Sequence, residues 1–138
     1  MRKGFTLVEI LVAVIILAVG ILAVSQMTVM GMRVNTVVNQ RMYARVVLAR
    51  QFEWLQNLPS GDSLLADHDA DPLDLDVVDS LDADFVEVVV DTTARYRYLT
   101  LWNVADDVPE AGLKTVRVHV VWGPTNRHHI SSDLIKRM

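Results

Sequence analysis

A nearly continuous apolar stretch dominates the start of the chain. It runs from Phe5 to Val24 with one acid inside it, Glu9, and it follows Arg2 and Lys3. A helix rises 1.5 Å per residue, so about 20 residues are enough to cross the hydrocarbon core of a bilayer. We therefore predict a transmembrane helix over residues 5–24. The positive charges before it predict a cytoplasmic N-terminus, with the rest of the chain across the membrane.

The helical pattern continues beyond this stretch. Residues 25–57 contain no proline, and apolar side chains recur about every 3.6 positions, at Met27, Met30, Val34, Val37, Val38, Met42, Val46, Leu48, Phe52 and Leu55. Pro59 ends the pattern, because the residue before a proline is driven out of the helical region. Residues 25–58 are thus predicted to be an amphipathic continuation of one long helix, with a stripe on which a domain packs.

The period of the pattern changes to two in the last third of the chain. β-Branched or alternating runs at residues 85–90, 95–104, 115–122 and 128–135 predict strands, with Tyr96, Tyr98 and Trp102 on a core face. An antiparallel sheet of three or four strands needs a cover, which the amphipathic half of the helix can supply. The predicted fold class is α+β: a long N-terminal helix, membrane-spanning in its first half, packed against a small antiparallel sheet within residues 85–136.

The charge changes sign between the helix and the sheet. Residues 62–91 contain eleven acids and no Lys or Arg. We predict an acidic loop over residues 60–84, with two interpretations: a solvated loop leaning on the arginines of the helix, or a Ca²⁺ site with Asp67, Asp69 and Asp71 as ligands. An EF-hand is excluded, because Pro72 occupies the position of its glycine and Val78 that of its bidentate Glu. The solvated loop is favoured, so no cofactor is expected.

Length and composition exclude several classes of function. The 138 residues leave room for one anchor and one small domain, and the absence of cysteine excludes a disulfide framework. A net charge of −4 disfavours nucleic-acid binding. The sequence has no Gly-rich phosphate loop and no arrangement typical of nucleophilic catalysis. His128 and His129, with His119 on a nearby strand, could suggest a metal cluster, but neighbours on a strand point to opposite faces. We predict instead that they are exposed polar histidines at the start of a strand. We expect no enzymatic activity.

Glu9 and the residues before it carry the most specific signal. A carboxylate within lipid costs roughly 2.5–3.5 kcal/mol, so an acid there suggests a function. No small-x-small site closes the apolar stretch, as a secretory signal would require, and the small residue available for cleavage is Gly4. Cleavage after Gly4 would remove residues 1–4 as a leader and leave Phe5 as a cationic terminus. The terminus of a neighbouring chain could then pair with Glu9 and select for lateral assembly.

This junction resembles the N-termini of type IV pilins and pseudopilins. Gly4-Phe5-Thr6-Leu7-Val8-Glu9 matches the recognition motif of the prepilin peptidase. The resemblance implies cleavage after Gly4, N-methylation of Phe5, and a filament core in which Glu9 contacts the terminus of the next subunit. Residues 12–22 and 114–135 are similar to minor pilins of the type IV pilus modification (PilV) group. Major pilins usually carry a kinking proline where this chain has Ser25-Gln26-Met27, which argues against the main filament subunit.

The resemblance implies a structural minor pilin of a type IV pilus or its initiating tip complex, acting in adhesion or motility. It would lie in the inner membrane, with residues 59–138 in the periplasm, before joining a cell-surface filament. The implied partners are the prepilin peptidase, other pilins through the N-terminal helix, the inner-membrane assembly platform, and membrane lipid before assembly. Three alternatives stay open: a minor pseudopilin of a type II protein secretion system, a Ca²⁺-dependent module on a pilin stalk, and, last, a membrane-anchored enzyme.

Overall fold

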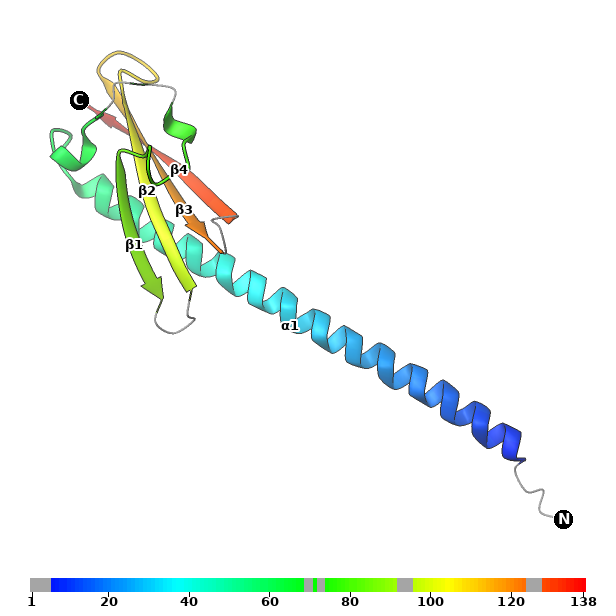
Figure 1. The fold of residues 1–138 in the computed structure, drawn as a ribbon. Helices are drawn as coiled ribbons and strands as arrows, with labels where there is room; N and C mark the ends of the chain where they lie inside the picture. Colours follow the sequence, from blue (N-terminus) through cyan, green and yellow to red (C-terminus); the bar gives the residue numbers. More distant parts are fainter. Residues whose placement is uncertain (1–5, 69–70, 72–73, 92–95, 124–127) are drawn as a thin grey trace. The chain divides into compact units, whose positions relative to one another are not determined.

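The computed structural model describes residues 6–68, 71, 74–91, 96–123 and 128–138. Figure 1 shows one long helix, two single-turn 3₁₀ helices and four strands: α1 (Leu7–Asn57), η1 (Ser63–Leu65), η2 (Asp74–Asp76), β1 (Phe85–Asp91), β2 (Tyr96–Asp106), β3 (Leu113–Trp122) and β4 (His128–Arg137). The chain divides into two compact units, an anchor unit of residues 1–40 and a sheet unit of residues 41–138.

The anchor unit consists of the first part of α1. Every side chain from Leu7 to Asn39 is exposed, and the helix contains a window of mean hydropathy 3.1, which makes it long and apolar enough to cross a membrane. The hydroxyls of Ser25, Thr28 and Thr36 each donate to the carbonyl four residues earlier, at 2.8–3.0 Å. These polar groups therefore have partners within the helix and need none from lipid or water.

The sheet unit contains a fully antiparallel sheet in the order β1-β2-β3-β4. Trp102 of β2 lies between Phe85 of β1 and Val118 of β3, and Leu134 of β4 lies opposite Val116. The predicted α+β class, an end of the helix just before Pro59 and all four strands are confirmed. β1, β2 and β4 end one or two residues later than their patterns, β3 begins two residues earlier, and β2 begins one residue later.

The C-terminal part of α1 covers one face of this sheet. Two buried clusters form the core there, one with Leu55, Leu65, Trp102, Val104, Val116, Val118 and Leu134, the other with Ala44, Val47, Tyr98, Val120 and Trp122. Tyr98 and Trp102 lie on the core face as predicted, whereas the side chain of Tyr96 is outside the described residues. The indole of Trp102 donates to the carbonyl of Leu64 at 2.9 Å, which joins the segment after the helix to the core.

The stripe of α1 that packs on the sheet is displaced from the predicted one. The buried positions are Ala44, Val47, Gln51 and Leu55, with Tyr43, Leu48 and Phe52 packed beside them. The prediction was wrong at Met42 and Val46, whose side chains are 61% and 63% exposed. It failed because the periodicity counted only large apolar residues. The contact instead uses the small side chain of Ala44, which allows close approach, and the polar side chain of Gln51.

The end of α1 is tied to the last strand. The ammonium of Lys136 in β4 donates to the carbonyls of Leu55 and Gln56, each at 3.1 Å, and also to that of Leu58. The last carbonyls of a helix have no partner within it, and a cation there also complements the helix dipole. Lys136 therefore caps the C-terminus of α1.

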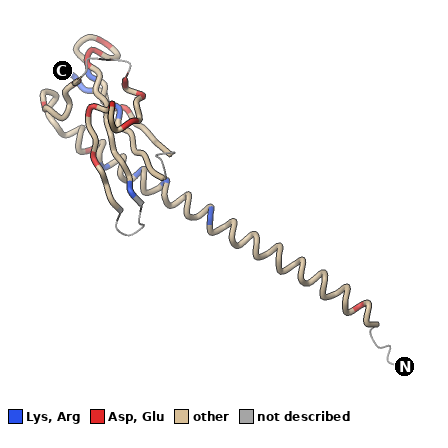
Figure 2. The backbone as a smooth tube through the Cα atoms, in the orientation of Figure 1, with Lys and Arg blue, Asp and Glu red and all other residues tan. Residues whose placement is uncertain are grey.

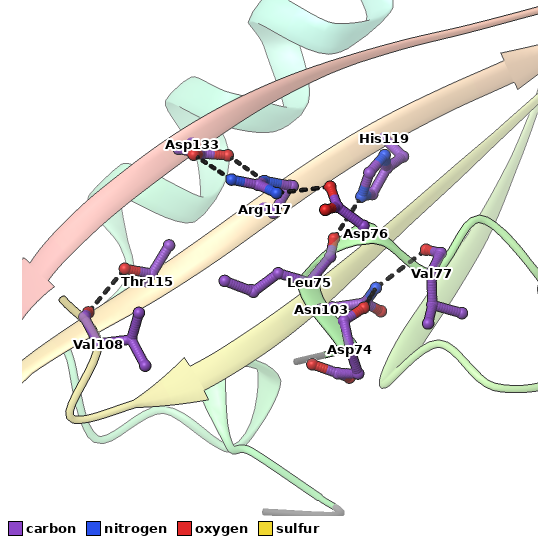
Figure 3. Close-up of polar contacts among 10 residues, drawn as sticks. All are labelled: Asp74, Leu75, Asp76, Val77, Asn103, Val108, Thr115, Arg117, His119 and Asp133. Carbon is purple, nitrogen blue, oxygen red and sulfur yellow. Dashed lines mark hydrogen bonds and ion pairs between the residues drawn. The ribbon is translucent and has the colours of Figure 1, made fainter. Parts of the chain in front are cut away.

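Part of the acidic segment covers the opposite face of the sheet. In η2, Asp74 and Leu75 are buried, so the prediction of a solvated loop was wrong at these two residues. Buried Asn103 of β2 holds this segment: its amide nitrogen donates to the carbonyls of Asp74 at 2.8 Å and Val77 at 3.0 Å. Its amide oxygen accepts from the backbone of Asp84 at 3.3 Å. Figure 3 shows Asn103 reaching from β2 to Asp74 and Val77.

Replacing Asn103 with leucine is expected to destabilise the sheet unit by roughly 2–4 kcal/mol, because each buried polar group left unpaired costs about 1–3 kcal/mol. The measurement is denaturant unfolding of the full chain in detergent, followed by tryptophan fluorescence. Asn57→Leu is the matched control, since Asn57 is exposed and donates to the carbonyl of Glu53 in its own helix. Equal stability of the two variants would contradict a role of Asn103 in holding η2.

Candidate functional site

The first turn of α1 is closed by a reciprocal pair of side chains. The backbone nitrogen and the hydroxyl of Thr6 both donate to Oε2 of Glu9, each at 2.9 Å. The backbone nitrogen of Glu9 donates to the hydroxyl of Thr6 at 3.3 Å. This is a capping box, in which two side chains three residues apart accept hydrogen bonds from backbone N–H groups that have no acceptor within the helix. Thr6-Leu7-Val8-Glu9 is the sequence signature of the box, a signal that our sequence analysis missed.

The capping box changes the interpretation of Glu9. The acid has a structural role within its own chain, in addition to any pairing between chains. Both bonds to its side chain go to Oε2, and among the described residues Oε1 accepts no hydrogen bond. The cap thus fixes the carboxylate at a helix N-terminus, where the helix dipole favours negative charge, and leaves one oxygen for a cation. Gly4 and Phe5 lie outside the described residues, so cleavage and methylation there stay predictions.

A second charged group joins the acidic segment to the sheet. Arg117 of β3 makes a bidentate pair with Asp133 of β4 at 2.6 and 2.7 Å, and it also contacts Asp76 of η2 at 2.6 Å (Figure 3). The hydrogen bonds that Arg117 donates to Asp133 raise the pKa of Arg117 and lower the pKa of Asp133. The arginine that Asp76 contacts is therefore on a strand, not on the helix as predicted. Through Asp76, this charged group holds η2 against the sheet.

The candidate calcium ligands are not brought together in the described part of the chain. Oδ2 of Asp67 accepts from the backbone of Asp106 at 3.3 Å, Asp71 is exposed, and Asp69 lies outside the described residues. No group of three or more metal-binding side chains occurs among the residues that the structure describes. Asp71 does line an open hollow of about 550 Å³, together with His68, Asp82 and Asp84. Calcium binding stays a prediction.

The three histidines of the sheet have different environments. His128 and His129 at the start of β4 are exposed, as predicted. His119 is only 2% exposed, and its Nε2 lies 2.8 Å from the carbonyl of Leu75, to which it donates as the neutral ring (Figure 3). Burial lowers the pKa of His119, and the nearby charges of His129 and Arg117 act in the same direction. The bond to Leu75 and the charge of Asp76 oppose this shift.

The free energy of unfolding is expected to fall as the pH drops below about 6.5, the ordinary pKa of histidine. Below this pH the histidine of the unfolded chain binds a proton, whereas buried His119 in the native state does not. The native state therefore loses stability until the pH reaches the lowered pKa of His119. The measurement is denaturant unfolding at several pH values from 7.5 to 5. His119→Gln should flatten this slope, whereas His128→Gln, at an exposed position whose charge is not among the causes of the shift, should keep it. An unchanged slope in His119→Gln would contradict the assignment.

Comparison with known proteins gives one match, and it covers the capped helix start. Residues 1–25 match the family model described as the prokaryotic N-terminal methylation motif. No curated protein and no solved structure matches the chain. The matched residues include Gly4, Phe5 and Glu9, and α1 continues from them with the length and hydropathy of a membrane anchor. The motif therefore supports a type IV pilin-like N-terminus of the kind that the prepilin peptidase processes, and the long apolar helix fits a membrane anchor.

Proposed function

We propose that the chain is a minor pilin, cleaved after Gly4, methylated at Phe5, and incorporated into a type IV pilus or its initiating tip complex. One observation carries the proposal: the methylation motif of residues 1–25 leads into a single helix, α1, whose anchor unit exposes apolar side chains throughout. Before assembly, lipid would cover this surface. In the filament, the helices of neighbouring subunits would replace the lipid.

The proposed mechanism is helix packing combined with charge neutralisation. Cleavage would create an ammonium group on Phe5, and Oε1 of Glu9 would accept a hydrogen bond from the Phe5 ammonium of the neighbouring subunit. The capping box supports this role, because it holds the carboxylate in place while using only Oε2. A charge buried in lipid without a partner is costly, so a correctly placed neighbour lowers the free energy of the assembly. The chain itself carries out no chemical turnover in this mechanism.

The proposed location is the inner membrane, with the sheet unit in the periplasm, followed by transfer into the filament. The partners would be the prepilin peptidase, the assembly platform and other pilins, which contact the chain through α1. Protease added to spheroplasts should digest the sheet unit and spare the anchor unit. Digestion only after the cells are lysed would contradict this orientation.

The proposal is tested by purifying the tagged chain from its native cells and measuring its intact mass. The expected mass corresponds to a chain that begins at N-methylated Phe5, and other processed pilins should be co-isolated. A strain without the prepilin peptidase is the control, in which residues 1–4 should be retained. A chain from normal cells that still begins at Met1 would contradict the proposal. Co-isolation of secretion pseudopilins instead of pilins would favour the type II secretion alternative.

A further inference from the structure

A groove within the sheet unit lies between α1 and the edge strand β1. β1 is outermost on one side of the sheet (Figure 1), and the groove has a volume of about 690 Å³. Sites for small ligands in proteins commonly have volumes of about 300–1,000 Å³. The walls of the groove include Tyr43, Val46, Arg50 and Trp54 of α1 and Glu87 and Val89 of β1. The groove is therefore large enough for a small ligand, and its walls combine aromatic, apolar and charged side chains.

Two buried polar groups at the interface of helix and sheet have no partner. Gln51 of α1, which also lines the groove, is 7% exposed, and its amide nitrogen has no hydrogen-bond partner among the described residues. The same holds for the hydroxyl of fully buried Thr100. Thr100 lies opposite Glu87 in the pairing of β2 with β1, so their side chains share the helix-facing side of the sheet. Buried polar groups are normally hydrogen-bonded, so these two indicate that a ligand group enters from the groove.

The groove carries one charge of each sign. Arg50 and Glu87 are both exposed, and the ion pairs of the described residues include neither of them. Figure 2 shows basic positions on α1 and acidic positions on β1. Glu87 also places a charge on the helix-facing side of an edge strand, which discourages the addition of another strand. A small ligand without a large net charge therefore suits the groove better than an extended peptide.

The polar groups of the groove call for a ligand that both donates and accepts hydrogen bonds. Arg50 and the amide nitrogen of Gln51 only donate, whereas the carboxylate of Glu87 only accepts. A carboxylate ligand would have no donor for Glu87, and an ammonium ligand would have no acceptor for Arg50. Hydroxyl groups can serve all three side chains, because each hydroxyl donates and accepts.

Trp54 adds an aromatic surface to these polar groups. Its side chain is 42% exposed, and its ring packs edge-on against Trp102 with the ring centroids 6.1 Å apart. A sugar ring carries hydroxyls around its rim and a C–H surface on its face, and that face packs well on an aromatic ring. We propose that the groove binds a saccharide, with Trp54 against the ring face and Arg50, Gln51 and Glu87 on its hydroxyls.

Saturation-transfer NMR on the full chain tests the proposal. The protein is held in a detergent without a sugar headgroup, and the probes are triacetylchitotriose, cellotriose and maltotriose. Saturating the aromatic protons of the protein is expected to transfer signal to the ring protons of at least one probe, and a titration gives its dissociation constant. Transfer to none of the three probes would overturn the proposal.

Substitutions place the binding in the groove. Trp54→Ala and Arg50→Ala are each expected to weaken binding at least roughly fivefold, since each removes a direct contact. Arg45→Ala is the matched control, because Arg45 is exposed on the same helix and is not among the residues that line the groove. Denaturant unfolding checks that each variant is folded, and exposed Arg50 keeps the test valid if Trp54→Ala is unstable. Equal affinities of Arg50→Ala and Arg45→Ala would overturn the proposal.

Saccharide binding goes beyond the proposed function and is separable from it. Failure to bind any probe by a chain that is cleaved and methylated would remove the saccharide site alone. Binding that depends on Arg50, by a chain that keeps residues 1–4 in normal cells, would retain the site and remove the minor-pilin proposal.

Discussion

Replacing Glu9 with glutamine is expected to leave the chain inserted and cleaved but to reduce its amount in filaments at least tenfold. Glutamine can form the same capping box with Thr6, so the helix start should be preserved. It cannot neutralise the Phe5 ammonium of a neighbour, and an unpaired charge in lipid costs roughly 2.5–3.5 kcal/mol. The measurement is the ratio of filament-bound to membrane-bound chain in sheared fractions, with the intact mass confirming cleavage.

Two further substitutions separate the charge of Glu9 from its capping role. Glu9→Val removes both, whereas Thr6→Ala removes the threonine hydroxyl from the box and keeps the charge. If the charge is decisive, glutamine and valine should fail equally, and Thr6→Ala should assemble better than either. Normal incorporation of Glu9→Gln would contradict charge pairing and leave capping as the function of this acid.

Substitution of Gly4 by valine is expected to abolish processing. The bulk of valine next to the cleaved bond should exclude the chain from the peptidase, and without cleavage Phe5 has no ammonium group to offer a neighbour. The intact mass should retain residues 1–4, and the chain should be absent from the filament fraction. Gly20→Val and Gly31→Val are the controls, since a Cβ at either position meets no atom within 4 Å. Mature chain at the normal level in Gly4→Val would contradict cleavage at this site.

The long helix and the strands could be predicted because their signals are local. The apolar stretch, the proline at 59 and the valine-rich alternations each depend on neighbouring residues. The pilin-like start was also readable, because Gly4, Phe5 and Glu9 lie within six positions. Even there, the capping box was missed, since the acid was considered only as a charge and not as an acceptor for Thr6.

The layer formed by η2 could not be predicted, because distant polar contacts create it. Asn103 reaches back to Asp74 and Val77, and His119 reaches back to Leu75. A polar side chain on a strand carries no local mark of whether a backbone carbonyl 26 to 44 residues away will cover it. The acidic composition indicated a solvated loop because composition reflects the side chains. The contacts with the sheet are instead made by backbone carbonyls of this segment.

The cap that Lys136 places on α1 also bears on the order in which the protein can be completed. The ammonium that secures the helix end is 80 residues downstream of Gln56, and a ribosome delivers the chain from its N-terminus. The anchor can therefore enter the bilayer before Lys136 has been synthesised and can cap the last turn of the same helix. Shortening the chain before Lys136 should leave that turn frayed, however well the anchor has inserted.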